Sequence, residues 1–338
     1  MSLCLTETKK STIMLNEEKR KIDLHLPTGW NDCTTEELEH IATAILYRTQ
    51  MQNRYRPFDW MAVKIDVLLA VNGLEVVSTE NDSGNNLSFI VRFKRPSLWQ
   101  RIRARVGRTA VQFHRNKDTD DFELPVDYIQ ALCERLDWIN DEKAAPMVNF
   151  PYPTLKLKGK TFEGPAPMMD GYQWNEYRLL QDWMQLYMMQ QNHALQVASS
   201  RQVTAQLLRQ SAADVDFARR HFLATLFHMS DYSEKADYSD MFSEFDPVKF
   251  QVILFWWSAF MQQLSKKFPR VFKVQPVKKG QKNQSPWDFY NRVTATLAAK
   301  YHASEDQQRN ETYSVTLQKL ENMAEEAAEM EKIRNKHK

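Results

Sequence analysis

Proline is concentrated in one short stretch of this sequence, and that concentration limits how the chain can fold. Five of the thirteen prolines lie between Pro146 and Pro167, together with Gly159 and Gly164. Because proline fixes φ and lacks a backbone N–H donor, no long helix or central strand can run through this stretch. For a chain of 338 residues we therefore expect two folded parts separated by a proline-rich linker at 146–169, with a short β-ribbon at 154–162 inside it.

The part before the linker reads as a small α+β domain at 26–145, preceded by a flexible or partner-dependent arm at 1–25. Thr34 or Thr35 can cap a first helix, and a second helix is expected from Pro57 to Val71. Branched and aromatic residues at 74–78 and 87–93 flank a turn-forming segment and predict a β-hairpin. Further strands are expected at 109–115 and 122–124, followed by a helix that begins at Pro125.

The part after the linker is predicted to be almost entirely helical. A helical domain at 170–303 is expected to contain helices at 172–199, 201–211, 214–229, 247–264 and 286–301. The last element, 304–333, carries apolar residues at alternating spacings of four and three, so it predicts a long amphipathic helix with a charged tail to 338. The fold class is therefore α+β, mainly α.

Composition supports this class and excludes several others. Only eight glycines disfavour a turn-rich all-β fold, and the 12% of aromatic residues is too high for a disordered chain. A net charge of +2 gives no global field for nucleic acid or membranes, and three distant cysteines do not form a disulfide framework. The most apolar run, 252–261, is about half of a membrane-spanning length. We expect a cytoplasmic protein without a membrane anchor.

One basic segment is a candidate nucleic-acid contact. It contains no acidic residue, includes Trp99, and holds the cations Arg92, Lys94, Arg95, Arg101, Arg103, Arg105 and Arg108. Neutralised phosphates release counterions and so add affinity, which makes a nucleic-acid-binding accessory protein the alternative hypothesis. The other interpretation of this segment is a solvated or protein-binding face.

Aromatic and methionine side chains in the first helix after the linker are candidate partner contacts. They permit two interpretations, which are not exclusive: core packing, or an adaptable surface for another protein or a second copy. The possible partner surface comprises Trp174, Tyr177, Trp183, Tyr187, Leu317 and Leu320.

The sequence indicates no reaction. It has no G-x-S-x-G elbow, phosphate-binding glycine loop, H-E-x-x-H motif or dinucleotide fingerprint. His221 and His228 are seven residues apart, where ligands to a shared metal prefer three or four. We therefore predict a non-enzymatic protein with no cofactor, no metal and no small-molecule substrate.

Several short motifs resemble an uncharacterised family in the structural gene blocks of phages and prophages of Bacteroidetes. The first motif, L-P-x-x-W followed by a threonine and a helix, is matched by Leu26, Pro27, Trp30, Thr34 or Thr35, and Leu38. An aromatic entry to the middle helix is matched by Tyr172, Trp174 and Tyr177. An F-x-W helix that ends in K-x-F-P is matched by Phe255, Trp257, Lys267, Phe268 and Pro269.

The resemblance implies a virion component or an assembly factor, most plausibly in tail morphogenesis. Such a protein would contact other phage structural or assembly proteins, including further copies of itself. It would act in the host cytoplasm or become part of the virion. The resemblance implies no catalytic residue.

Overall fold

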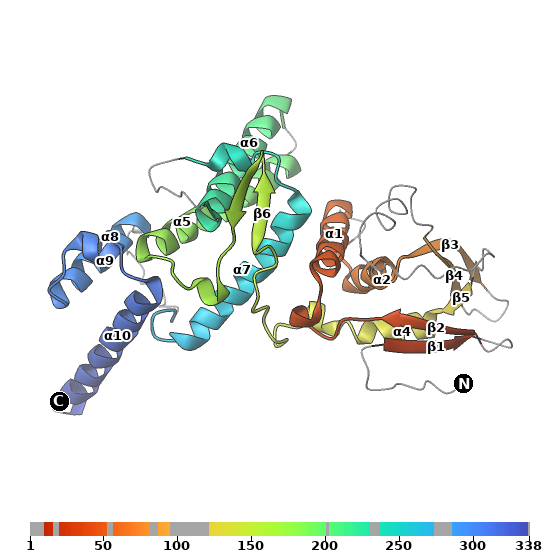
Figure 1. Ribbon diagram of the computed structural model, residues 1–338, viewed down its shortest axis with the longest axis horizontal. Helices are drawn as coiled ribbons and strands as arrows, with labels where there is room; N and C mark the ends of the chain where they lie inside the picture. Colours follow the sequence, from red (N-terminus) through yellow and green to blue (C-terminus); the bar gives the residue numbers. More distant parts are fainter. Residues whose placement is uncertain are drawn as a thin grey trace. The chain divides into compact units, whose positions relative to one another are not determined.

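The computed structural model describes residues 10–15, 20–52, 57–81, 87–94, 122–200, 203–229, 237–273 and 286–336. The chain divides into two compact units, an N-terminal unit of Met1–Ala145 and a C-terminal unit of Pro146–Lys338 (Figure 1). The predicted α+β, mainly α class is confirmed, because helices make up most of the described chain and the sheets have two or three strands.

The N-terminal unit combines two small antiparallel sheets with a few helices. Strands β1 and β2 form a hairpin, and β4 lies between β3 and β5 in the second sheet. Their bounds are β1 Lys10–Leu15, β2 Arg20–His25, β3 Leu74–Asn81, β4 Leu87–Phe93 and β5 Phe122–Pro125. The helical elements are η1 Trp30–Asp32, α1 Thr35–Met51, α2 Trp60–Val71, α4 Val126–Glu134 and η2 Asp137–Ile139.

Most predicted elements of this unit are confirmed, including the 74–93 hairpin, the strand at 122–124 and the two first helices. Within the arm expected at 1–25, residues 10–15 and 20–25 pair as antiparallel strands that satisfy each other's backbone groups. The rest of that arm, 1–9 and 16–19, lies outside the described residues. Pro57 does not open α2, because Asp59 caps that helix by accepting from the Met61 N–H at 2.8 Å. The strand expected at 109–115 lies outside the described residues.

The C-terminal unit is built on a pair of long antiparallel helices, α5 and α6, with α7 packed beside them (Figure 1). Its helical elements are η3 Pro167–Met169, α5 Trp174–Ser199, α6 Ala205–Leu226, η4 Ser239–Phe242, α7 Pro247–Lys267, α8 Pro286–Lys300, α9 Glu305–Arg309 and α10 Tyr313–Lys336. A small sheet of β6 Thr154–Leu157, β7 Lys160–Glu163 and β8 His228–Met229 completes the unit.

The segment 146–169, expected to be a linker, is instead part of this unit. The predicted ribbon is present as β6 and β7, and β7 also pairs with β8. Phe150 packs edge-on against Phe227 and Trp256, with ring centroids 5.5 and 4.8 Å apart, and Phe162 is fully buried. The prolines prevent long helices or strands in this segment. The aromatic side chains between the prolines nevertheless pack the segment against the helices of the unit.

Two helix predictions are also corrected. The helices expected at 201–211 and 214–229 are one helix, α6, because Ala212 and Ala213 favour helix and no glycine or proline interrupts them. The single helix expected over 304–333 is divided into α9 and α10. Among the described residues, no helix reaches the length and apolarity that crossing a bilayer requires.

Candidate interaction surface

The start of α5 is held in the core by a stack of four aromatic rings. Tyr290, Trp174, Tyr177 and Tyr313 follow one another with centroid separations of 4.7, 5.8 and 5.0 Å and interplanar angles near 21°. The rings come from α8, α5 and α10, so the stack joins three helices that are far apart in sequence. Stacked aromatic pairs of this kind add to the free energy gained from burial alone.

Backbone and hydroxyl groups reinforce this stack. The Trp174 N–H donates to the Glu311 carbonyl at 2.7 Å, and the Tyr313 N–H donates to the Tyr172 carbonyl at 3.0 Å. The Tyr290 hydroxyl donates to the Trp174 carbonyl at 2.7 Å. Burial raises the pKa of Tyr313 to about 12, so this phenol is protonated at neutral pH and can donate to the Met168 carbonyl. These groups have structural partners within the unit.

Four of the six residues expected at a partner surface are therefore core residues. Trp174, Tyr177, Tyr187 and Leu317 are buried, which agrees with the core-packing interpretation of the stripe. Trp183 and Leu320 are half-buried. The Trp183 ring lies 4.5 Å from that of His221 on α6, so part of this side chain also serves the α5–α6 packing.

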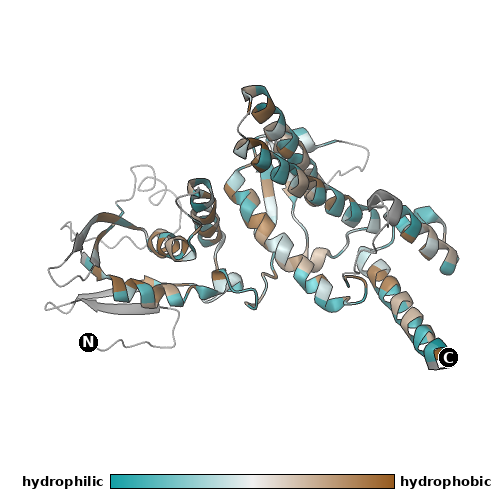
Figure 2. Cartoon of the chain, turned by 180° about the vertical axis from the view of Figure 1, so that it is seen from behind, coloured by the Kyte–Doolittle hydropathy of each residue, from teal (hydrophilic) through white to brown (hydrophobic). Residues whose placement is uncertain are grey.

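Most exposed apolar side chains of these helices lie instead between the middle of α5 and the first turn of α6. Met188, Met189 and Leu195 on α5 are 49%, 58% and 62% exposed. Figure 2 shows hydrophobic residues along both helices of this hairpin up to its end. We call the following six exposed residues the hairpin-end surface: Met188, Met189, Leu195, Val203, Leu207 and Leu208.

The hairpin-end surface is also almost without charge. Between Asp182 and Asp214 the only Lys, Arg, Asp or Glu residues are Arg201 and Arg209, in a chain of which 26% is charged. Cores of protein interfaces are depleted of charged residues and enriched in methionine, whose flexible side chain adapts to a partner. Large exposed apolar side chains that cluster in this way are typical of an interaction site.

Sequence periodicity missed this surface because it selected the large aromatic residues, which are the ones the core buries. The signal that could have found it is the long interval between Asp182 and Asp214 in which only two residues are charged.

The structure does not describe enough of the basic segment 92–108 to test whether its cations form a nucleic-acid site. Arg92 lies in β4 and Lys94 directly follows it, while Arg95, Arg101, Arg103, Arg105 and Arg108 lie outside the described residues. The nucleic-acid alternative stays a prediction from sequence.

The two histidines considered as metal ligands face different partners. His221 Nε2 lies 3.7 Å from an Asp237 carboxylate oxygen, whereas His228 Nε2 lies 3.2 Å from Glu176 Oε1 and its ring stacks on Tyr172. Within the described ranges, no three His, Cys, Asp or Glu side chains come close enough together to hold a metal ion.

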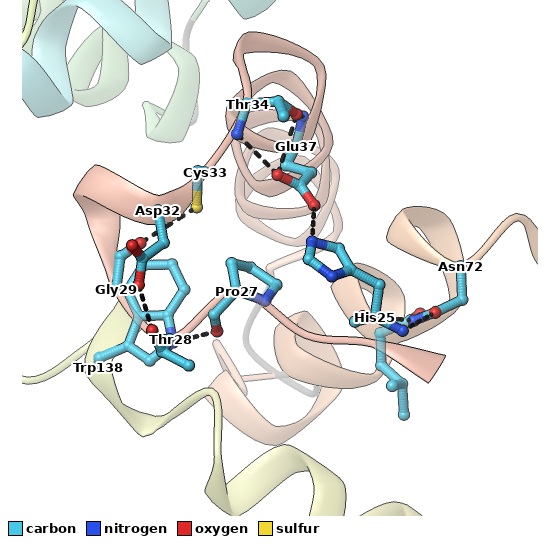
Figure 3. Close-up of polar contacts among 11 residues, drawn as sticks. His25, Pro27, Thr28, Gly29, Asp32, Cys33, Thr34, Glu37, Asn72 and Trp138 are labelled. Carbon is cyan, nitrogen blue, oxygen red and sulfur yellow. Dashed lines mark hydrogen bonds and ion pairs between the residues drawn. The ribbon is translucent and has the colours of Figure 1, made fainter. Parts of the chain in front are cut away.

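A second polar cluster surrounds the start of α1 in the N-terminal unit (Figure 3). Glu37 accepts from the Thr34 backbone N–H at 2.7 Å, and its other carboxylate oxygen lies 2.7 Å from His25 Nε2. The His25 backbone N–H donates to the Asn72 side-chain oxygen at 2.7 Å, and this hydrogen bond connects β2 to the end of α2. The Trp138 indole N–H donates to the Pro27 carbonyl at 3.1 Å.

These contacts give the L-P-x-x-W motif a structural role. Leu26 is buried, and the Trp30 ring packs edge-on against Trp138 with centroids 5.0 Å apart. The Cys33 thiol in the same cluster is a weak nucleophile at neutral pH. Burial, with the nearby Glu37 and Asp32 carboxylates, raises the pKa of this thiol to about 12, so it stays protonated.

Comparison with protein families, with curated proteins and with solved structures finds no match to this chain. The hairpin-end surface therefore has to be interpreted from its own chemistry.

Proposed function

We propose that this protein is a non-enzymatic morphogenesis or virion protein of a phage or prophage that acts through protein–protein contacts, with tail assembly as its step. The observation that carries the interaction role is the hairpin-end surface, where six large apolar side chains are exposed on an almost uncharged helix pair. The resemblance of the 26–38, 172–177 and 255–269 motifs to a phage structural family supports the biological setting.

The shape of the α5–α6 hairpin suits this role. Towards its end, Val197 and Ser211 are the buried residues, whereas the side chains between them are mostly exposed in the described chain. Met188 and Leu195 are seven residues apart, so both lie on one side of α5. A partner protein that covers this side would bury apolar area on two helices at once, which favours association.

The test is co-purification from cells that produce the particle, with the captured proteins identified by mass spectrometry. The variant Met188→Glu/Leu195→Glu places two charges on the hairpin-end surface, and because both positions are exposed it should keep its fold. We expect recovery of head or tail proteins to fall at least tenfold. The control Gln130→Glu adds a charge at an exposed polar position of α4, outside the hairpin-end surface, and should recover them normally.

Two outcomes would overturn the proposal. In the first, the wild-type protein is recovered without any structural or assembly protein. In the second, the double variant recovers the same proteins in the same amounts as the wild type, which would remove the hairpin-end surface from the interaction.

A further inference from the structure

Helix α10 changes its environment half-way along. In its first half Tyr313, Leu317 and Glu321 are buried against the C-terminal unit. From Glu325 to Asn335 every side chain is exposed, and Met330 and Ile333 are 65% and 57% exposed. About three turns of helix therefore extend beyond the packed core, with no covering element among the described residues (Figure 1).

Ion pairs fix the point from which this exposed part extends. Glu325 pairs with Arg270 at 2.9 Å, and Glu326 pairs with Lys300. Beyond them, Glu329, Glu331, Lys332 and Arg334 form no ion pair with any described residue. The charges nearest the end of the helix are thus available to a second molecule.

Helical geometry arranges these residues around one apolar stripe. Successive residues are rotated by about 100°, so Met330 and Ile333 lie within one narrow face. Glu326 falls on the same face one turn earlier, where it is paired with Lys300. On that geometry Glu331 and Arg334 flank the stripe on one side, and Glu329 flanks it on the other. Lys332 lies on the opposite face of the helix.

We propose that the exposed half of α10 pairs with the same segment of a second copy of this chain, in antiparallel orientation. In a two-fold antiparallel pair the same flank of each helix meets its counterpart, which is the isologous arrangement. Glu331 of each copy then faces Arg334 of the other, and Met330 lies close to Ile333 of the other. Charged residues that flank an apolar seam set partner choice and orientation in this way.

The parallel arrangement is disfavoured by the same charges. Parallel helices bring opposite flanks together, so Glu331 of one copy would face Glu329 of the other, and the two carboxylates would repel. Self-pairing with complementary charges therefore selects one orientation and one register. In this register the sequence numbers of two residues that face each other across the pair sum to roughly 664.

The pairing is expected to be weak for an isolated pair. About nine residues per copy, 328–336, overlap in this register. The contact therefore lies at the low end of interface size, and short helix pairs are only marginally stable in water. The monomer–dimer equilibrium should therefore appear at tens to hundreds of micromolar protein, and it should weaken as salt screens the ion pairs.

Charge reversal tests the proposal in the full-length chain by sedimentation equilibrium. Glu331→Arg and Arg334→Glu should each abolish the dimer, because each creates two like-charge contacts across the pair. An equimolar mixture of the two variants should restore it, since every facing contact is then between opposite charges. A purely intrahelical pair between positions 331 and 334 would not be restored by mixing. The control Lys332→Glu changes a charge on the opposite face and should leave the dimer unchanged.

Disulfide formation tests the orientation. In variants with the three native cysteines replaced, Ile333→Cys lies near the two-fold axis and should form a covalent dimer on oxidation. Ala327→Cys should not, because its counterpart would be displaced by about ten residues along the helix, or roughly 15 Å. A wild-type chain that stays monomeric at several hundred micromolar, a mixture that fails to dimerise, or equal disulfide yields at both positions would each overturn the proposal. This proposal concerns α10 alone and is independent of the hairpin-end surface.

Discussion

At the scale of single residues, Glu37 joins the start of α1 to the end of β2 through one carboxylate. It caps α1 together with Thr34, and its other oxygen lies 2.7 Å from His25 Nε2 at the end of β2. The sequence allowed either Thr34 or Thr35 as the cap. The structure selects Thr34 because only that residue has a glutamate three positions later whose side chain can return to the cap N–H.

We predict that Glu37→Ala lowers the free energy of unfolding by about 1–2 kcal/mol, since it removes the returning half of the capping box from a nearly buried position. Urea denaturation followed by circular dichroism measures the loss. The matched control is Glu36→Ala, which is exposed in the same helical turn and should change stability by no more than about 0.5 kcal/mol. Equal effects of the two substitutions would contradict the role assigned to Glu37.

At the scale of elements, the hydrophobic and capping pattern of the sequence predicted which segments are helical, but it did not predict correctly where several of these helices end. Helix α7 begins where Asp246 and Pro247 predict, because the cap and the fixed φ are both local. The break between α9 and α10 has a different origin. Thr312 forms a β-bridge with Gln173, the residue that precedes α5, and no periodicity in 304–333 can reveal that contact.

The β6–β7 ribbon offers an element-scale prediction. A Cβ at Gly164, just after β7, would lie 2.5 Å from both a Phe150 ring carbon and the Tyr152 carbonyl oxygen. Gly164→Ala should therefore cost roughly 1–3 kcal/mol of stability through overpacking. Gly29→Ala is the control, because no heavy atom lies within 4 Å of its Cβ and its backbone is extended. Thermal unfolding compares the two variants, and an undisturbed midpoint for Gly164→Ala would refute the close approach.

At the scale of the whole molecule, the division falls between Ala145 and Pro146, and the proline-rich segment belongs to the C-terminal unit. Phe150 and Phe162 are buried among side chains of α7, η4 and the end of α6. The unit is therefore larger than the helical domain expected at 170–303.

This division predicts how fragments behave. A fragment 146–338 should be helical and unfold cooperatively, because it retains the buried aromatic residues of the ribbon. A fragment 170–338 loses them and should melt at a clearly lower temperature, since loss of a buried phenylalanine alone costs about 3–5 kcal/mol. Circular dichroism melts of both fragments provide the measurement. If both melt at the same temperature, the segment 146–169 is a linker after all.

The sequence by itself determined the class of this protein and the positions of most helices and strands. These features depend on local chemistry: caps, proline, glycine and hydrophobic spacing act over a few residues. Only the tertiary structure decided which apolar residues are buried and which are exposed. Trp174, Tyr177 and Met188 look alike in a helical pattern, but Trp174 and Tyr177 are buried against rings from α8 and α10, whereas Met188 is 49% exposed. Exposure is a property of contacts between distant segments, so the candidate surfaces could be found only after those segments were placed.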